Sequence, residues 1–251
     1  MSINEIFPNP TVKQVIFQIR YPNLFYMENK IGDLQLKIMN EFPQSKLIIR
    51  RDILVTDIGS EEKFKEIQND LESNIGKKIW QFKSEKNFML NILSDSLDIT
   101  SEYHKTYNLD GGDKFRDAIE YVINSFFEIV SIPVLNRIGL RYIDECPLPN
   151  KDNKTYKEYY NTCFPIDRFN INEADEMNFK VITQKGEYNL RYLELLRKFD
   201  NKYKVILDFD AFALKIVSKN CLKVTDKLHN IIIEEFEKTI KEPIYKYMRQ
   251  K

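Results

Sequence analysis

The chain has 251 residues, of which 43% are hydrophobic and 13% aromatic, so it carries enough apolar material for a folded core and is not an intrinsically disordered protein. Its 38 basic and 38 acidic residues give a formal net charge of zero. That balance argues against nucleic-acid binding driven by bulk charge, although it leaves room for a local basic groove. Glycine is scarce, with 7 residues, which leaves little material for phosphate-binding loops.

The cysteines and the hydropathy pattern indicate where the protein works. Cys146, Cys163 and Cys221 are far apart and form no Cys-x-x-Cys pair, so reduced thiols are expected in place of a disulfide framework or a structural zinc site. Residues 1–10 lack the basic and apolar regions of a signal peptide, and no window approaches the roughly 18 apolar residues of a membrane span. We expect a cytoplasmic protein without a membrane partner.

The first half of the chain alternates between patterns typical of strands and of helices. Side chains over 12–21 alternate with period two, and apolar residues over 26–42 recur every three or four positions. Residues 109–113 predict a turn that ends in Asp113 as a helix N-cap. The expected elements are a strand over 12–21, a helix over 26–42, a strand over 46–58, a polar segment over 59–77, a hairpin of strands over 79–84 and 87–94, a strand over 97–107 and a helix over 114–130.

The second half follows a similar order. It opens with a period-two strand through 134–144 and ends with a long amphipathic helix over 222–248. Pro243 is expected either to kink that helix or to begin a separate final turn. Between them lie a short helix over 156–164 and three strands over 178–183, 187–199 and 202–214.

Apart from the additional strand over 46–58 in the first half, each half therefore follows the order strand, helix, three strands, helix. Aligning Arg20-Tyr21 with Arg141-Tyr142 also brings Phe17 onto Ile138, which suggests an internal duplication. We predict an α+β fold of antiparallel sheets backed by helices, with the halves 1–132 and 133–251 packed as one unit.

Several short motifs stand out along the chain: Asn9-Pro10, the segment VIFQIRY over 15–21, the segment RIGLRYI over 137–143, and Leu228-His229 in the terminal helix. Together they resemble a sporadically distributed prokaryotic family whose members have about this length and no assigned function. The patchy distribution of such a family implies accessory genes, including defence and toxin–antitoxin loci. The resemblance implies no reaction, and no catalytic residue is carried over from it.

A face that carries arginines is the first candidate site. The strand through 134–144 places Arg137, Gly139 and Arg141 on one face, and Arg20 ends the first strand in the same way. These arginines could bind an anion, with Gly139 leaving space for a ligand backbone or a phosphate. The alternative is that the arginines pair with acidic residues on a covering helix or lie in water.

Asp208 and Asp210 form the second candidate site, because two aspartates two positions apart on a strand share a face and can hold a divalent metal. A phosphoryl-transfer site also needs a third carboxylate and a phosphate-binding loop, and neither occurs at a suggestive spacing. The alternative is an outward polar face. His104 and His229, the only histidines, form no metal-binding motif, and we expect no cofactor.

The sequence alone does not reveal an activity. With no complete catalytic constellation, the leading hypothesis is a non-catalytic protein that binds a protein partner or a second copy of itself, and catalysis is left open. Tyrosines lie beside basic residues in segments 156–160 and 245–249, and Tyr and Arg are favoured at protein interfaces. The alternatives are a nucleic-acid or nucleotide-binding module that uses Arg20, Arg137 and Arg141, and a metal-dependent phosphoryl-transfer enzyme centred on Asp208 and Asp210.

Overall fold

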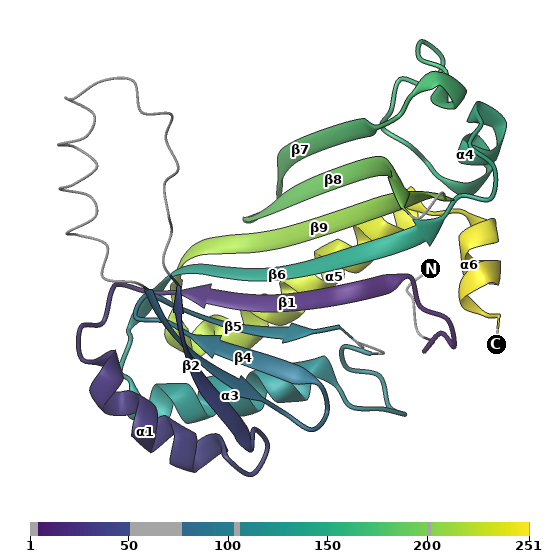
Figure 1. Ribbon diagram of the computed structural model, residues 1–251. Helices are drawn as coiled ribbons and strands as arrows, with labels where there is room; N and C mark the ends of the chain where they lie inside the picture. The colour runs from purple at the N-terminus through teal and green to yellow at the C-terminus, as the bar shows by residue number, and fades with distance from the viewer. Residues whose placement is uncertain (1–4, 51–76, 103–105, 200–201, 251) are drawn as a thin grey trace, which may run out of the picture.

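The part of the chain that the structure describes folds around one antiparallel sheet of nine strands, backed by helices, as the computed structural model in Figure 1 shows. The described residues are 5–50, 77–102, 106–199 and 202–250. The strands lie in the order β2-β3-β4-β5-β1-β6-β9-β8-β7, and all neighbouring strands are antiparallel. The prediction of an α+β fold with antiparallel strands backed by helices is confirmed.

The strands and helices have the following bounds. The strands are β1 (Val12–Arg20), β2 (Gln44–Arg50), β3 (Lys77–Lys83), β4 (Phe88–Ile92), β5 (Ser96–Ser101), β6 (Val134–Pro147), β7 (Met177–Lys185), β8 (Tyr188–Phe199) and β9 (Lys202–Val217). The helices are α1 (Met27–Ile38), α3 (Phe115–Ile129), α4 (Asn153–Tyr159), α5 (Cys221–Thr239) and α6 (Glu242–Met248), with short 3₁₀ helices η1 (Ile171–Glu173) and η2 (Ser218–Asn220). Among these helices, none is long and apolar enough to cross a lipid bilayer.

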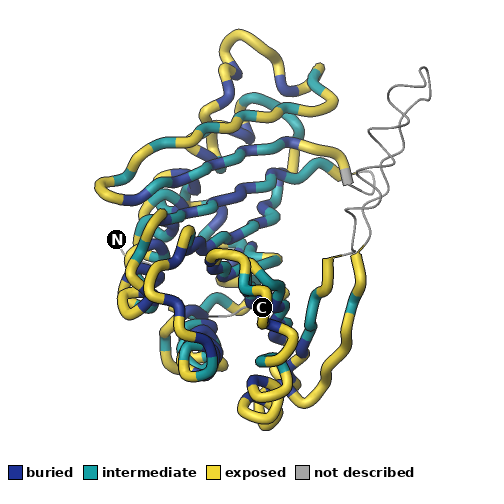
Figure 2. The backbone as a smooth tube through the Cα atoms, turned by 90° about the vertical axis from the view of Figure 1, so that its left-hand side faces the viewer, coloured by how far each residue is buried: buried dark blue, intermediate teal, exposed yellow. Residues whose placement is uncertain are grey.

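The core lies between the sheet and the helices on one side of it. The central strands alternate between buried residues and more exposed ones, as Figure 2 shows along the backbone. On β1 the buried positions are Val15, Phe17 and Ile19, which is the apolar face that the period-two pattern predicts. Burial of this face against the helices is the main term that stabilises the fold.

Long helices cover that apolar face. Phe126 of α3 packs against Tyr21 just after β1, with ring centroids 5.4 Å apart. Phe236 of α5 meets Phe209 of β9 edge to face at 6.1 Å, and Figure 1 shows α5 running behind β6 and β9. Helix α1 packs against α3 and buries one stripe of its surface. The opposite face of the sheet therefore has no such layer over its centre among the described residues.

Helix boundaries differ from the predicted ones where backbone groups find other partners. Asp113 does not cap α3: the N-cap position is Lys114, and the first N–H groups of the helix donate instead to the carbonyls of Thr106 and Tyr107, at 3.1 and 3.0 Å. Helix α4 begins earlier than predicted because Asp152 caps it. The predicted terminal helix ends at Thr239, and α6 follows as a separate helix with Pro243 in its first turn.

Several predicted strands also shift. The strand predicted over 46–58 begins two residues earlier, as β2, and its last part together with most of the polar segment over 59–77 lies outside the described residues. The strand predicted over 97–107 ends at Ser101. The hairpin between β3 and β4 turns through Asn87, which adopts φ +61°, a conformation that asparagine tolerates better than most residues.

The two predicted halves meet through β1 and β6, which pair at the centre of the sheet. In both halves the first strand is central, and the last strand before the long helix lies beside it. The first half has four strands after α1, because β2, the strand predicted over 46–58, adds an edge strand to the three of the repeat pattern. The internal duplication itself stays a prediction.

A buried glutamate anchors the segment around α4 to the sheet. Glu194 of β8 has no exposed surface, and its carboxyl group accepts hydrogen bonds from the hydroxyls of Tyr156, Thr162 and Tyr192 and from the backbone N–H of Cys163. Each oxygen has two donors, so the buried group is fully satisfied. This one side chain therefore joins β8 to three positions in and after α4.

We predict that Glu194→Ala lowers the free energy of unfolding by about 3 kcal/mol or more, since it leaves several buried donors unpaired. Chemical denaturation followed by circular dichroism measures this effect. Glu158→Ala, an exposed glutamate on α4, is the matched control and should change stability by no more than about 0.5 kcal/mol. Equal effects of the two substitutions would contradict the anchoring role.

Candidate functional site

The candidate site lies on the sheet face that points away from α1, α3 and α5, which we call the open face. In Figure 1 the central strands present this face to the viewer without a described helix in front of them. The strand pairing brings the predicted residues together, with Arg20 opposite Arg137, Gln18 opposite Gly139 and Ile16 opposite Arg141. The side chains here line an open hollow of about 470 Å³.

Arg141 makes the most regular contact on this face. Its Nε and Nη2 atoms donate to Oδ1 and Oδ2 of Asp208, both at 2.7 Å, in a bidentate pair. The Asp208 side chain is 3% exposed, whereas that of Arg141 is 35% exposed. Hydrogen bonding to Asp208 raises the pKa of Arg141 above its usual range, so this arginine is charged at every relevant pH.

Arg137 lies across the same face toward the neighbouring strands. Its Nη2 donates to Oδ1 of Asp210 at 2.6 Å, and its Nη1 donates to Oε1 of Gln18 at 3.3 Å. Its guanidinium carbon lies 4.9 Å from the ring centroid of Phe212, a cation–π contact. The side chains of Arg137 and Asp210 are 18% and 15% exposed, so the pair is held in place and largely shielded from solvent.

Arg191 of β8 joins the two aspartates and was not singled out from the sequence. Its Nη2 lies 3.4 Å from Asp208 and its Nε lies 3.5 Å from Asp210. This Nε is buried, and it lacks a hydrogen bond; among the described residues it is the one buried side-chain nitrogen or oxygen of which this is true. Arg191 is therefore held more loosely than Arg137 or Arg141, and we call these three arginines with Asp208 and Asp210 the arginine–aspartate cluster.

Gly139 has a different role from the predicted one. A Cβ atom at this position would lie 2.2 Å from Nη1 of Arg137, because the guanidinium of Arg137 folds over the glycine. The space that we assigned to a ligand backbone or a phosphate is thus filled by the protein's own side chain. The glycine is needed so that Arg137 can lie flat against the strand and reach Asp210.

The sequence treats the arginines and the aspartates as two sites, and the structure makes them one. The expected partners of the arginines on a covering helix are absent from the described residues, and carboxylates of the adjacent strand β9 take that role. Since guanidinium groups already occupy Asp208 and Asp210, the pair offers no open metal site. In the part of the chain that the structure describes, no group of three His, Cys, Asp or Glu residues could hold a metal ion.

The cluster has an excess of positive charge. Arg20 is exposed, and its contact on this face is a hydrogen bond from Nε to Oε1 of Gln18 at 3.0 Å. Four guanidinium groups, those of Arg20 and the three cluster arginines, therefore face the two cluster carboxylates, an excess of about two positive charges within this group. Asp98 of β5, which is opposite Gln18 in the strand pairing, adds a further carboxyl group to the same face.

A second polar row crosses the first half of the open face. Gln81 donates to Asn91 at 2.7 Å, and Asn91 donates to Asp98 at 2.9 Å, so three neighbouring strands are joined by side-chain hydrogen bonds. Burial raises the pKa of Asp98, and its hydrogen bonds with Asn91 and Thr100 oppose that rise. The alternation of polar residues along these strands could have indicated this row, but not which residues would be neighbours.

The remaining candidates lie elsewhere. His229 is on α5, on the other side of the sheet, where its ring stacks on Tyr107 with centroids 4.0 Å apart. His104 lies outside the described residues. A scan against protein-family models, a search of curated proteins and a search of solved structures each return no match for this chain.

We predict that Gly139→Ala displaces Arg137 from Asp210 and Gln18 while changing the free energy of unfolding by less than about 1 kcal/mol, since the end of an arginine can move. A crystal structure of the variant and its thermal unfolding measure the two effects. In an Arg137→Ala background the same substitution should have no further effect. Gly32→Ala is the control, since a Cβ there meets nothing within 4 Å. An unmoved Arg137 in the Gly139→Ala variant would contradict this role.

Proposed function

We propose that the chain is a non-catalytic protein-binding module and that the open face holds its partner. The observation that carries this proposal is the network of ion pairs and hydrogen bonds on the uncovered face. Arg137 and Arg141 are fixed on it in a half-buried network with aspartates and an amide. An antiparallel sheet can expose one face to water, but freely solvated faces do not require such a network.

The composition of the face favours a protein over a nucleic acid. Aspartates offset half of the arginine charge at its centre, which weakens attraction to a phosphate backbone. Apolar side chains lie among the charges: Ile16 is opposite Arg141, Leu193 is opposite Asp208, and Ile182, 61% exposed, is opposite Arg191. A mixture of arginine and aliphatic surface is typical of protein interfaces.

The charges also indicate the chemistry of the partner. Arg20 and the loosely held Arg191 border the hollow, and together with Arg137 and Arg141 they leave the face positive. A partner that contributes carboxylates beside an apolar patch would complement both features. Acidic side chains could bind Arg20 directly, since its described contact is with the neutral amide of Gln18.

The cellular setting is part of the same proposal. Cys146, Cys163 and Cys221 are free thiols, which is compatible with a reducing cytoplasm. Membership of a sporadically distributed prokaryotic family, and with it a role beside defence or toxin–antitoxin genes, rests on the sequence motifs alone. A second copy of the chain is the other protein that the face could accept.

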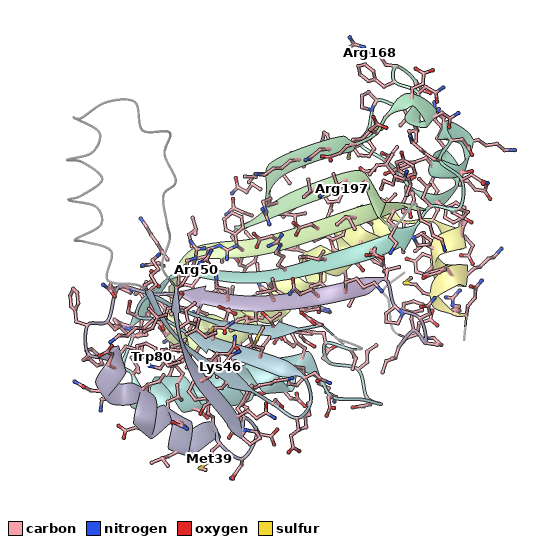
Figure 3. The ribbon with its side chains drawn as sticks, in the orientation of Figure 1. Met39, Lys46, Arg50, Trp80, Arg168 and Arg197 are labelled. Atoms are coloured by element: carbon pink, nitrogen blue, oxygen red, sulfur yellow. The ribbon has the colours of Figure 1, made fainter. Side chains whose placement is uncertain are left out.

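We predict that Arg20→Glu reduces capture of the partner at least tenfold, because it reverses the charge at the exposed edge of the cluster. The measurement is affinity purification of the tagged protein from its native host, followed by mass spectrometry and nucleic-acid analysis. Arg168→Glu is the matched control, since this exposed arginine lies far from the open face, beyond β7 in Figure 3. Ile182→Asp tests the apolar part of the face independently.

Each outcome bears on the proposal. An acidic protein that co-purifies with the wild type and with Arg168→Glu, but with neither open-face variant, supports it. A partner retained by both open-face variants would place the interface elsewhere. Nucleic acid that is released by salt, with no stoichiometric protein, would replace the proposal with the nucleic-acid alternative.

A further inference from the structure

A recess on the helix side of the sheet is independent of the open face. It lies between β6, α5 and the segment before β1, and it has a volume of about 120 Å³. Helix α6 borders it through Met248, whose carbonyl accepts a hydrogen bond from the N–H of Asn9 at 3.0 Å. Cavities of comparable volume admit molecules the size of benzene, at roughly 150 Å³.

Aromatic rings make up much of the lining of this recess. The aromatic side chains that line it are Phe7, Tyr107, Tyr142, His229 and Phe236. His229 stacks on Tyr107, and its ring centroid lies 5.9 Å from that of Tyr142, so the imidazole contacts both tyrosines. The π faces of such rings attract cations, and grouped aromatic rings are the usual receptors for organic ammonium ions.

A buried carboxyl group faces this aromatic recess. Asp144 of β6 is 4% exposed, and its Oδ1 accepts a hydrogen bond from the hydroxyl of Thr11 at 2.8 Å. Among the described residues, no cation is paired with this carboxyl group. A buried carboxyl group without a paired cation is unusual, since burying a charge requires compensation.

Among the described residues, the other ionisable groups near the recess do not supply that compensation. These groups are Glu5, Tyr107, Tyr142, Cys146, Asp226 and His229. Burial raises the pKa values of the two tyrosines and the cysteine, and burial lowers the pKa of His229 to about 4, so all four are neutral at pH 7. Glu5 and Asp226 pair with Arg249 and Arg116. Burial raises the pKa of Asp144 to about 7.

We propose that this recess binds a small organic ammonium ion, with Asp144 as its counter-charge and the surrounding aromatic rings as its walls. The recess brings no uncompensated positive charge of its own among the described residues, and the carboxylate and the ring faces both attract a cation. A ligand whose ammonium group ends a short apolar stem fits the volume and the lining.

Proton release follows from this arrangement. Below pH 7 most molecules carry a protonated Asp144, so a bound cation shifts the carboxyl group toward its ionised form and a proton leaves to solvent. Affinity for a cation of fixed charge should therefore rise with pH and level off above about pH 7. A neutral ligand that accepts a hydrogen bond from the protonated acid would show the opposite trend.

The test uses choline, whose charge does not change with pH, and its uncharged carbon isostere 3,3-dimethyl-1-butanol. Titration calorimetry on the full chain should detect choline binding that strengthens about 10- to 30-fold between pH 5.5 and pH 8, with the isostere at least tenfold weaker at pH 8. Calorimetry in two buffers of different ionisation enthalpy measures the proton released at pH 6 on the wild-type protein alone.

Asp144→Asn is the matched variant, and we expect it to remove the preference for choline and the dependence on pH. Its thermal unfolding checks that the fold is retained, and the proton-release measurement stands on its own if it is not. Equal binding of the two probes, binding that does not change with pH, absence of choline binding at pH 8, or choline binding that survives Asp144→Asn would each overturn the proposal.

Discussion

The pairing of β1 with β6 is the contact on which the rest of the molecule depends. These strands join the two halves, and each places most of its apolar residues toward the helices and most of its polar residues on the open face. Gln18 and Gly139 lie opposite each other at the centre of this pair. The alignment that equates Arg20 with Arg141 also equates these two residues, so a local two-fold axis through them would relate the halves. Arg137 can lie over this point because Gly139 has no side chain.

The same two strands serve two separate surfaces with different electrostatics. On the open face, arginines and aspartates neutralise one another in pairs and leave a modest positive excess, which suits recognition of a macromolecule over a broad area. On the helix side, Asp144 projects from β6 into aromatic surroundings where the described residues hold no paired cation for it. A one-residue slip of β6 against β1 would exchange the two sets of side chains, so the register of this pair determines both sites.

Much of the fold could be predicted from the sequence because period two and period 3.6 are local properties. The apolar face of β1, the α3 helix and the shared face of Arg137 and Arg141 follow from spacing alone. The union of these arginines with Asp208 and Asp210 could not be predicted, because it depends on the placement of β9 beside β6 in the sheet. The position of Asp144 had a local signal that we did not use: it continues the apolar alternation of Leu140 and Tyr142, where a carboxyl group is out of place.

The central place of β1 has a consequence for how the chain acquires its structure. A nascent chain emerging from the ribosome presents β1 early, and β5 can pair with one of its edges, but the other edge stays open until β6 has been made. Such a delay exposes a β-strand edge to aggregation and favours shielding by a chaperone. The aromatic recess is completed later still, because α6, which borders it, is synthesised after every strand of the sheet.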